Sequence, residues 1–422
     1  MLIRLNDMVN SKSKYSIQKS ILINSIGVVF LLFTQWLLTI TITKINGFSD
    51  VGRYTLAVSF TNIFYIIASF NIRSYQVSDI EPKFSENVYL SSKVVTILFT
   101  VIIFVFFLYF SNFSVIQMVL TSIYFLYRMV DVFVDVTHGV FQKRWRFELI
   151  TQSNILRGIF TYLSFTVAFL FIKKLEISMI LLLFSSIIVL IYFDIKNLVK
   201  MTNIRINIKN REILTLLYTC LPIMLASVFT MLSSYIPRME IGNILGEEAL
   251  GIFAAISVPT LLIQVGAGIL MMPLTTHFAE IYDRKEYSNF AKEITKFTLI
   301  FAGLSFLIYY LSQFVSSPVL KILYGQDIEQ YISLFQPMIF VSILTSFQIY
   351  FITINIVFRD SKAVLLSGIS GVIFSILVSQ RILISKGLSG TPFIFELILI
   401  SQIAISIVFI IIHLVRRIIT SK

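Results

Sequence analysis

Cysteine is almost absent from this 422-residue sequence, and charged residues are scarce. The single cysteine, Cys220, has no partner, which excludes a disulfide-stapled secreted domain. Three histidines in separate segments and one cysteine provide no cluster suited to a metal site, so we expect neither a metal nor a cofactor. The phosphate-binding loop G-x-x-x-x-G-K-[ST] is also missing, which excludes ATP hydrolysis by this chain.

Charged residues make up 13% of the chain, whereas soluble proteins usually contain about 25%. Hydrophobic residues reach 57%, with 40 Phe and 19 Tyr, and the mean hydropathy is +0.88. Glycine and proline are too few for a collagen-like or low-complexity chain. The composition therefore predicts a membrane protein with many spans. The net charge of +12 would suggest nucleic acid in a soluble protein, but no nucleic-acid-binding fold fits between the apolar runs.

The apolar runs are long enough to cross a bilayer, which takes about 20 residues in a helix. Helices are expected because the backbone has to satisfy its own hydrogen bonds in lipid. The first run follows a polar lead and has no small-residue cleavage site, so we expect a span rather than a cleaved signal peptide. Twelve runs are predicted, at about 20–43, 52–72, 94–112, 116–136, 151–172, 177–193, 213–236, 250–272, 297–315, 331–357, 363–384 and 392–414.

Lysine and arginine are distributed unevenly between the two sides of the predicted spans. With both termini inside, 24 of the 34 basic residues fall in inner segments and 8 in outer ones. Because inner loops of membrane proteins are enriched in basic residues, we predict that both termini are cytoplasmic. The longest gap between runs, 194–212, is too short for a catalytic domain. We therefore expect no enzyme, because a membrane-embedded enzyme of this kind needs a sizeable outer loop for its catalytic residues.

Two short motifs indicate an internal repeat. Gly52-Arg53-Tyr54 opens the second run and Gly251-Ile252-Phe253 opens the eighth, 199 residues later. Six plus six helices in the same orientation imply a parallel repeat related by an axis along the membrane normal. We predict two six-helix bundles, residues 1–205 and 206–422, with a cavity between them.

Ionisable residues inside predicted spans are costly and are usually paired or functional. Arg128, Asp131 and Asp135 share one face of the fourth run, since they are three, four and seven residues apart. Arg157 on the fifth run is expected at the level of Arg128 and Asp131. Two interpretations stay open: an ion-pair network that staples two helices, or the lining of a polar cavity in which an arginine contacts an anionic substrate.

Several segments carry a resemblance to a known family. They are Arg73–Asp79 (R-S-Y-Q-V-S-D), Asp131–Gly158, Ile236–Phe253 with its I-P-R and L-G-E elements, and Ile322–Gly325 (I-L-Y-G). Together they resemble Wzx-type polysaccharide flippases of the multidrug/oligosaccharidyl-lipid/polysaccharide exporter (MOP) superfamily, which includes the MATE antiporters and the lipid II flippase MurJ. Met239 departs from the aromatic residue expected there.

The resemblance implies an all-α, MATE/MurJ-like fold of two bundles. It implies alternating-access transport of an undecaprenyl-pyrophosphate-linked oligosaccharide repeat unit from the cytoplasmic to the outer leaflet, for O-antigen, capsule or exopolysaccharide. The polymerase machinery would be a partner, and coupling to a proton or a sodium gradient stays open. The candidates for contacts to the anionic substrate are Arg53, Arg73, Arg128, Arg157, Arg238 and Arg359.

A MATE-like drug or metabolite antiporter on the same fold is the alternative. Such a transporter needs acidic residues in its cavity to hold Na⁺, H⁺ or a cationic substrate. Asp131 and Asp135 keep this alternative open, whereas two arginines at the same depth oppose it.

Overall fold

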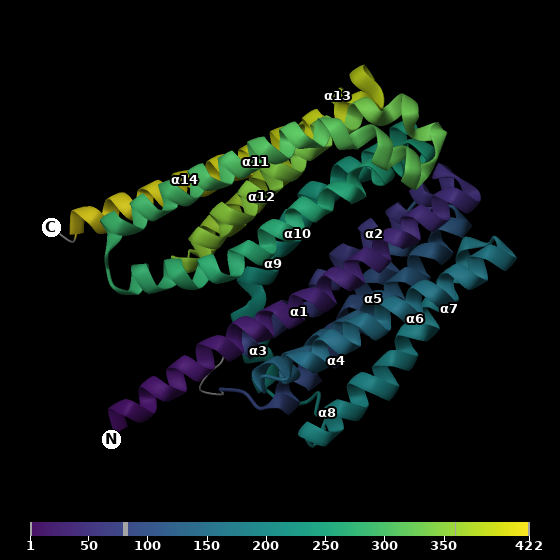
Figure 1. Cartoon of the computed structure of the whole chain (residues 1–422). Helices are drawn as coiled ribbons and strands as arrows, with labels where there is room; N and C mark the ends of the chain where they lie inside the picture. Colours follow the sequence, from purple (N-terminus) through teal and green to yellow (C-terminus); the bar gives the residue numbers. More distant parts are fainter. Residues whose placement is uncertain (1, 79–82, 359, 421–422) are drawn as a thin grey trace. The chain divides into compact units, whose positions relative to one another are not determined.

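A computed structural model of the whole chain describes residues 2–78, 83–358 and 360–420. Throughout that part the secondary structure is helical, without a strand (Figure 1). The prediction of an all-α fold is confirmed, and the predicted apolar runs all fall on helices.

The first half of the chain contains long helices joined by short turns. They are α1 (Leu2–Asn46), α2 (Phe48–Ser69), α3 (Ile72–Ser78), α4 (Glu86–Phe110), α5 (Val115–Lys143), α6 (Phe147–Ile172) and α7 (Leu175–Val189). A π-helical segment, η1 (Leu190–Ile195), continues α7 directly into α8 (Lys196–Met201).

The second half follows the same style. It consists of α9 (Glu212–Leu245), α10 (Glu247–Asp283), α11 (Tyr287–Tyr324), the 3₁₀ segment η2 (Gln326–Leu334), α12 (Phe335–Val357), α13 (Ser361–Lys386), the 3₁₀ turn η3 (Gly387–Gly390) and α14 (Thr391–Thr420). Asp360 caps α13 by accepting a hydrogen bond from the Ala363 amide at 3.1 Å.

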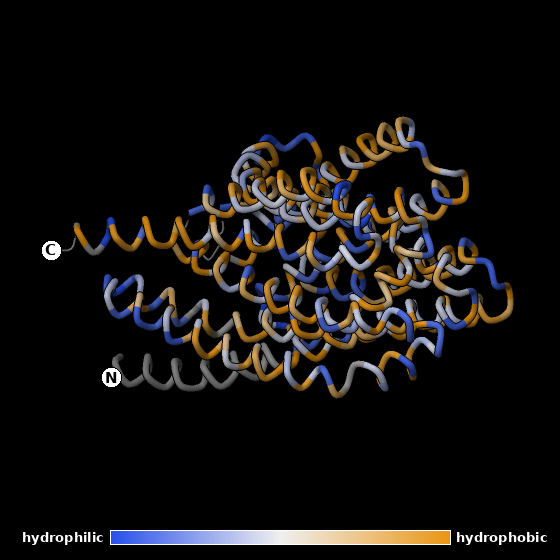
Figure 2. Tube along the Cα trace, turned by 90° about the horizontal axis from the view of Figure 1, so that it is seen from above, coloured by the Kyte–Doolittle hydropathy of each residue, from blue (hydrophilic) through white to orange (hydrophobic). Residues whose placement is uncertain are grey.

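Ten stretches of the described chain are long and apolar enough to cross a membrane. One of them, Ser361–Arg417, contains both α13 and α14, and α5 is not among the ten. Large apolar side chains such as Phe106, Phe171 and Phe306 are more than half exposed on the outer faces of helices. Figure 2 shows hydrophobic residues along the helices, while several connecting turns are hydrophilic. The chain is a multi-pass membrane protein, and the number of twelve crossings stays a prediction.

The contacts divide the chain into two compact units. Unit 1 comprises Met1–Thr41 and Phe64–Cys220, and unit 2 comprises Ile42–Ile63 and Leu221–Lys422. The end of α1 and the first part of α2, up to Ile63, thus belong with the C-terminal helices. The predicted boundary near residue 205 stays a prediction.

Aromatic clusters hold each unit together. In unit 1 the Phe104 and Phe125 rings stack with centroids 3.8 Å apart, and both meet Phe64 edge-on. In unit 2 the Phe358 ring stacks on His413 at 4.2 Å. Such pairs stabilise a helix bundle beyond the effect of burying their surface.

Candidate functional site

A polar stripe runs along α5 and points into unit 1. Arg128, Asp131, Asp135, His138 and Gln142 recur at three- or four-residue intervals, which places them on one side of a helix. The Arg128 guanidinium donates to Asp131 Oδ2 at 2.8 Å. Its planar face also covers the Tyr65 ring, with Cζ 3.9 Å from the ring centroid, a favourable cation–π geometry.

Arg157 on α6 joins this stripe to the sixth run. Its Nη1 donates to Asp131 Oδ1 at 2.8 Å and to Ser186 Oγ at 3.1 Å, and its Nη2 reaches Asp194 Oδ2 at 3.5 Å. The side chains of Arg157 and Asp194 are 3% and 0% exposed. The predicted meeting of Arg157 with Arg128 and Asp131 is therefore present, and it extends to a third helix.

Asp135 belongs to a second group of charges. Its two oxygens face Arg73 Nη1 on α3 at 3.3 Å and Lys93 Nζ on α4 at 3.4 Å. Lys93 is fully buried and also donates to the Ser69 carbonyl at 2.6 Å, while Arg73 Nη2 donates to Gln142 Oε1 at 2.9 Å. The charged residues of α5 thus belong to two groups, one around Asp131 and one around Asp135, whereas the spacing along α5 suggested a single network.

The charges in these two centres do not cancel. Four basic side chains (Arg73, Lys93, Arg128 and Arg157) face three carboxylates (Asp131, Asp135 and Asp194). Asp131 and Asp135 each face two of these basic side chains. Asp194 faces Arg157 and also His138, whose Nε2 lies 3.6 Å away. With a neutral imidazole the cluster carries one excess positive charge.

Only part of the cluster is open to its surroundings. The Arg73 side chain is 28% exposed and Arg128 16%, against 16% for Asp135 and 17% for Asp131, whereas Lys93 and Arg157 are closed off. Arg73 and Arg128 are therefore the basic members of the cluster that keep some contact with its surroundings. Lys93 and Arg157 are placed to position Asp135 and Asp131.

Arg53 lies in unit 2, where α2 meets α10. Its Nε donates to Glu247 Oε2 at 2.7 Å, and its Nη1 lies 3.3 Å from Asp50. The two helices touch at the glycines of the predicted repeat. A Cβ on Gly52 would fall 1.8 Å from the Glu247 carbonyl, and one on Gly251 would fall 1.8 Å from the Phe48 carbonyl.

Arg238 and Arg359 are the remaining two arginines that the sequence predicts as substrate contacts. Arg238 follows Pro237 inside α9, and its guanidinium has no ion pair or hydrogen bond to any residue that the structure describes. Arg359 lies outside the described residues.

Comparison with known proteins identifies the chain. The family model "Polysaccharide biosynthesis protein" matches residues 47–333. The chain belongs to this polysaccharide biosynthesis family. The capsular polysaccharide biosynthesis protein CapF of Staphylococcus aureus is 26% identical over 304 residues, covering 69% of this chain and 74% of CapF.

Solved structures show the same fold. A MOP superfamily transporter from Pyrococcus furiosus aligns with 96% of each chain at a TM-score of 0.65 and 15% identity. A MATE transporter from Vibrio cholerae aligns with 98% of this chain and 99% of its own at a TM-score of 0.65 and 11% identity. This member of the polysaccharide biosynthesis family thus has the fold of MOP superfamily transporters, the fold that its sequence resemblance implied.

Sequence reasoning missed two charged members of the cluster in this protein. Lys93 immediately precedes the third predicted run and was counted among the inner-loop charges, and Asp194 immediately follows the sixth. Because the helices extend beyond the apolar runs, both side chains lie inside unit 1. In both cases the sequence places a charged residue directly at the edge of an apolar run, and this position could have indicated a buried charge.

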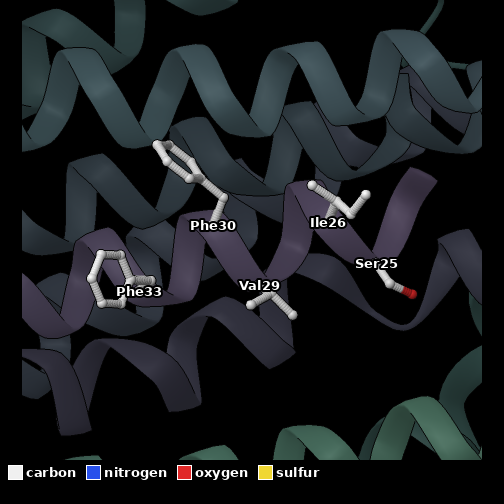
Figure 3. Close-up of a pocket in the computed structure, with 5 residues that line it drawn as sticks. All are labelled: Ser25, Ile26, Val29, Phe30 and Phe33. Carbon is white, nitrogen blue, oxygen red and sulfur yellow. The ribbon is translucent and has the colours of Figure 1, made fainter. Parts of the chain in front are cut away.

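An apolar groove follows α1 in unit 1, lined by Ser25, Ile26, Val29, Phe30 and Phe33 (Figure 3). The opposite side of the helix packs closely on α6, since a Cβ on Gly27 would lie 2.8 Å from Thr151 Cα. Apart from Ser25, its lining side chains are hydrocarbon, which suits contact with lipid chains.

Proposed function

We propose that this transporter moves an undecaprenyl-pyrophosphate-linked oligosaccharide repeat unit from the cytoplasmic to the outer leaflet by alternating access. The product would be a surface polysaccharide: O-antigen, capsule or exopolysaccharide. Family membership supports a glycan substrate, and the similarity to CapF supports a role in making a surface polymer.

The excess positive charge of the unit 1 cluster carries the proposal. A diphosphate with attached sugars cannot cross hydrocarbon unaided, because loss of hydration costs many kcal/mol. Arg73 and Arg128 combine partial exposure with a guanidinium fork that can donate two bonds to one phosphate. In unit 2, Arg238 is the candidate for a second anionic contact because its guanidinium has no partner among the described residues.

The antiporter alternative fits this geometry less well. A cationic drug or Na⁺ would need a carboxylate that is not already neutralised. Asp131, Asp135 and Asp194 each face two basic groups inside unit 1. The Pyrococcus furiosus relative is itself described as having a binding pocket of reverse polarity with a different function, so this fold accommodates pockets of more than one charge.

Location and energy supply are part of the same proposal. The excess of basic residues on one side supports an inner-membrane protein with both termini in the cytoplasm. An ion gradient is the expected source of energy, and the polysaccharide polymerase machinery is the expected partner for the exported unit.

Depletion of the protein in its native bacterium tests the function. We expect a lipid-linked repeat unit to accumulate on the inner leaflet and surface polysaccharide to fall, measured with labelled sugar and a membrane-impermeant oxidant. Wild type should restore export, and Arg73→Ala with Arg128→Ala should not. Arg146→Ala is the control, since Arg146 is half exposed beside Glu148 at the α5–α6 turn. Drug sensitivity with normal surface glycan would favour the antiporter instead.

A further inference from the structure

The π-helical segment η1 places an acidic side chain inside unit 1. Of its six residues, only Asp194 is buried, with 0% exposure. A π-helical turn within a longer helix is rare and is frequently found at functional sites. Neither Asp194 nor its neighbour His138 is used by the proposed contacts to substrate.

Asp194 and His138 face each other across η1 and α5. His138 Nε2 lies 3.6 Å from Asp194 Oδ1, just beyond hydrogen-bond length, and the imidazole is 4% exposed. Neither of these two atoms has a hydrogen-bond partner within the described part of the chain. The other oxygen, Oδ2, lies 3.5 Å from Arg157 Nη2.

Further unsatisfied polar atoms lie on the helices around this pair. Gln76 on α3 is fully buried, and both of its amide atoms lack a partner among the described residues. Its Oε1 approaches α5 at Gly139, the residue after His138, because a Cβ there would fall 2.1 Å away. Ser153 Oγ on α6 is also buried without a partner in the described part of the chain. Buried polar atoms normally find partners, so these atoms mark the region as a candidate site.

We propose that His138 and Asp194 form a proton-binding site inside unit 1, and that proton binding there is coupled to transport. This rests on the proposed function as an ion-driven transporter. The step is simple: a proton from water forms an N–H bond on His138 and is shared with Asp194 Oδ1, and it returns to water when the bond breaks. Imidazole is the side chain best suited to exchange protons near neutral pH.

A proton fits this site better than a metal ion. Hard cations select oxygen ligands, and one Asp194 oxygen already faces Arg157 while the other faces an imidazole nitrogen. The charged side chains around His138 are Asp194 from η1, Arg157 from α6 and Arg73 from α3. With two guanidinium groups nearby, an added Na⁺ would face electrostatic repulsion.

The site is also connected to Arg128, whose side chain is 16% exposed. Basic and acidic groups alternate from His138 through Asp194, Arg157 and Asp131 to Arg128, with successive separations of 3.6, 3.5, 2.8 and 2.8 Å. A positive charge on His138 would weaken the hold of Asp194 on Arg157. Arg157 would then depend on Asp131, the carboxylate that it shares with Arg128. Proton binding can thus change how firmly Arg128 is held.

Nitrogen-15 NMR of the full-length protein in lipid nanodiscs, labelled at histidine, tests the site directly. The chain contains three histidines, and His138→Gln assigns the relevant signal. We expect this signal to titrate as the pH is varied over the range in which the protein stays folded, and its midpoint to move to lower pH in Asp194→Asn, because the carboxylate favours the charged imidazole. Sodium should leave it unchanged. His277→Gln, which removes a more exposed imidazole, is the control.

A His138 signal that keeps one protonation state across that range, or that titrates identically in Asp194→Asn, would overturn the proposal. The wild-type titration needs no substitution, so a variant that fails to fold does not obscure the result. The NMR experiment needs no substrate. If His138 does not titrate but the protein is needed for glycan export, only the proposed proton site is ruled out. If His138 titrates as expected but depleted cells keep normal surface glycan, the proposed flippase function is ruled out instead.

Discussion

Arg157 is the residue whose removal most sharply tests the ion-pair cluster. Arg157→Met takes away the group that bridges Asp131 and Asp194 at 2.8 and 3.5 Å. Asp131 keeps Arg128, but Asp194 is left with an imidazole beyond hydrogen-bond length in a site with 0% exposure. Breaking one side of a buried charge pair costs about 3–5 kcal/mol, because the remaining charge is uncompensated.

Removing the stranded charge as well should recover most of that loss. The double variant Arg157→Met, Asp194→Asn leaves Arg73, Lys93 and Arg128 opposite Asp131 and Asp135, with the same excess charge as the wild type. We expect the single variant to show a lower thermal midpoint in detergent and less protein in the membrane, and the double variant to approach wild type in both. Arg146→Met controls for loss of an exposed arginine.

Glycan export divided by the amount of protein in the membrane shows whether the same variants lose activity as well as stability. If the proton site is needed, export by the double variant should stay low although its amount recovers. A single variant as stable as wild type, or a double variant no more stable than the single, would refute the argument that Arg157 stabilises unit 1 by compensating Asp194.

Three further outcomes follow from the contacts. Gly251→Val should reduce folded protein, since its Cβ would overlap the Phe48 carbonyl at 1.8 Å, whereas Gly266→Val, with no atom within 4 Å, should be tolerated; fluorescence-detected gel filtration compares them. Lys93→Met should lower the thermal midpoint, because Asp135 is left with Arg73 alone, and adding Asp135→Asn should restore part of the loss. Arg53→Gln should leave the midpoint nearly unchanged, because its ion pairs are about one-third exposed and such pairs contribute at most about 1 kcal/mol; a large drop would contradict this.

The helices were predictable because apolar length alone decides them in a membrane. The approach of Arg157 to Asp131 was also predictable, since antiparallel neighbouring helices bring residues at equal depth together. The pairing of Asp135 with Arg73 and Lys93 was not, because it depends on which way α3 and α4 face α5. Spacing along one helix gives a face, but it does not give the partner opposite that face.

The glycine motifs also show what the sequence can predict and what needs the structure. The match between Gly52 and Gly251 predicted a repeat, but their direct packing in unit 2 appears only in three dimensions. Two other glycines share the relation: Gly47 and Gly246 lie five residues before them and both have positive φ, 86° and 92°. A positive φ favours glycine, so each of these α1–α2 and α9–α10 turns needs its glycine for the same backbone reason.

The interior of unit 2 uses a different chemistry from that of unit 1. There Gln402 accepts from Gln348 at 2.6 Å and donates to Ser233 Oγ at 2.9 Å, and a Cβ on Gly371 would fall 2.1 Å from its amide nitrogen. Neutral amides satisfy one another without the desolvation cost of a charge, and they hold α9, α12, α13 and α14 together through hydrogen bonds of the kind that join membrane helices. If the charges of unit 1 served only to staple helices, amides would do so at lower cost. Their retention in unit 1, with two arginines open to the surroundings, is better explained by a task that requires charge: binding an anion and exchanging a proton.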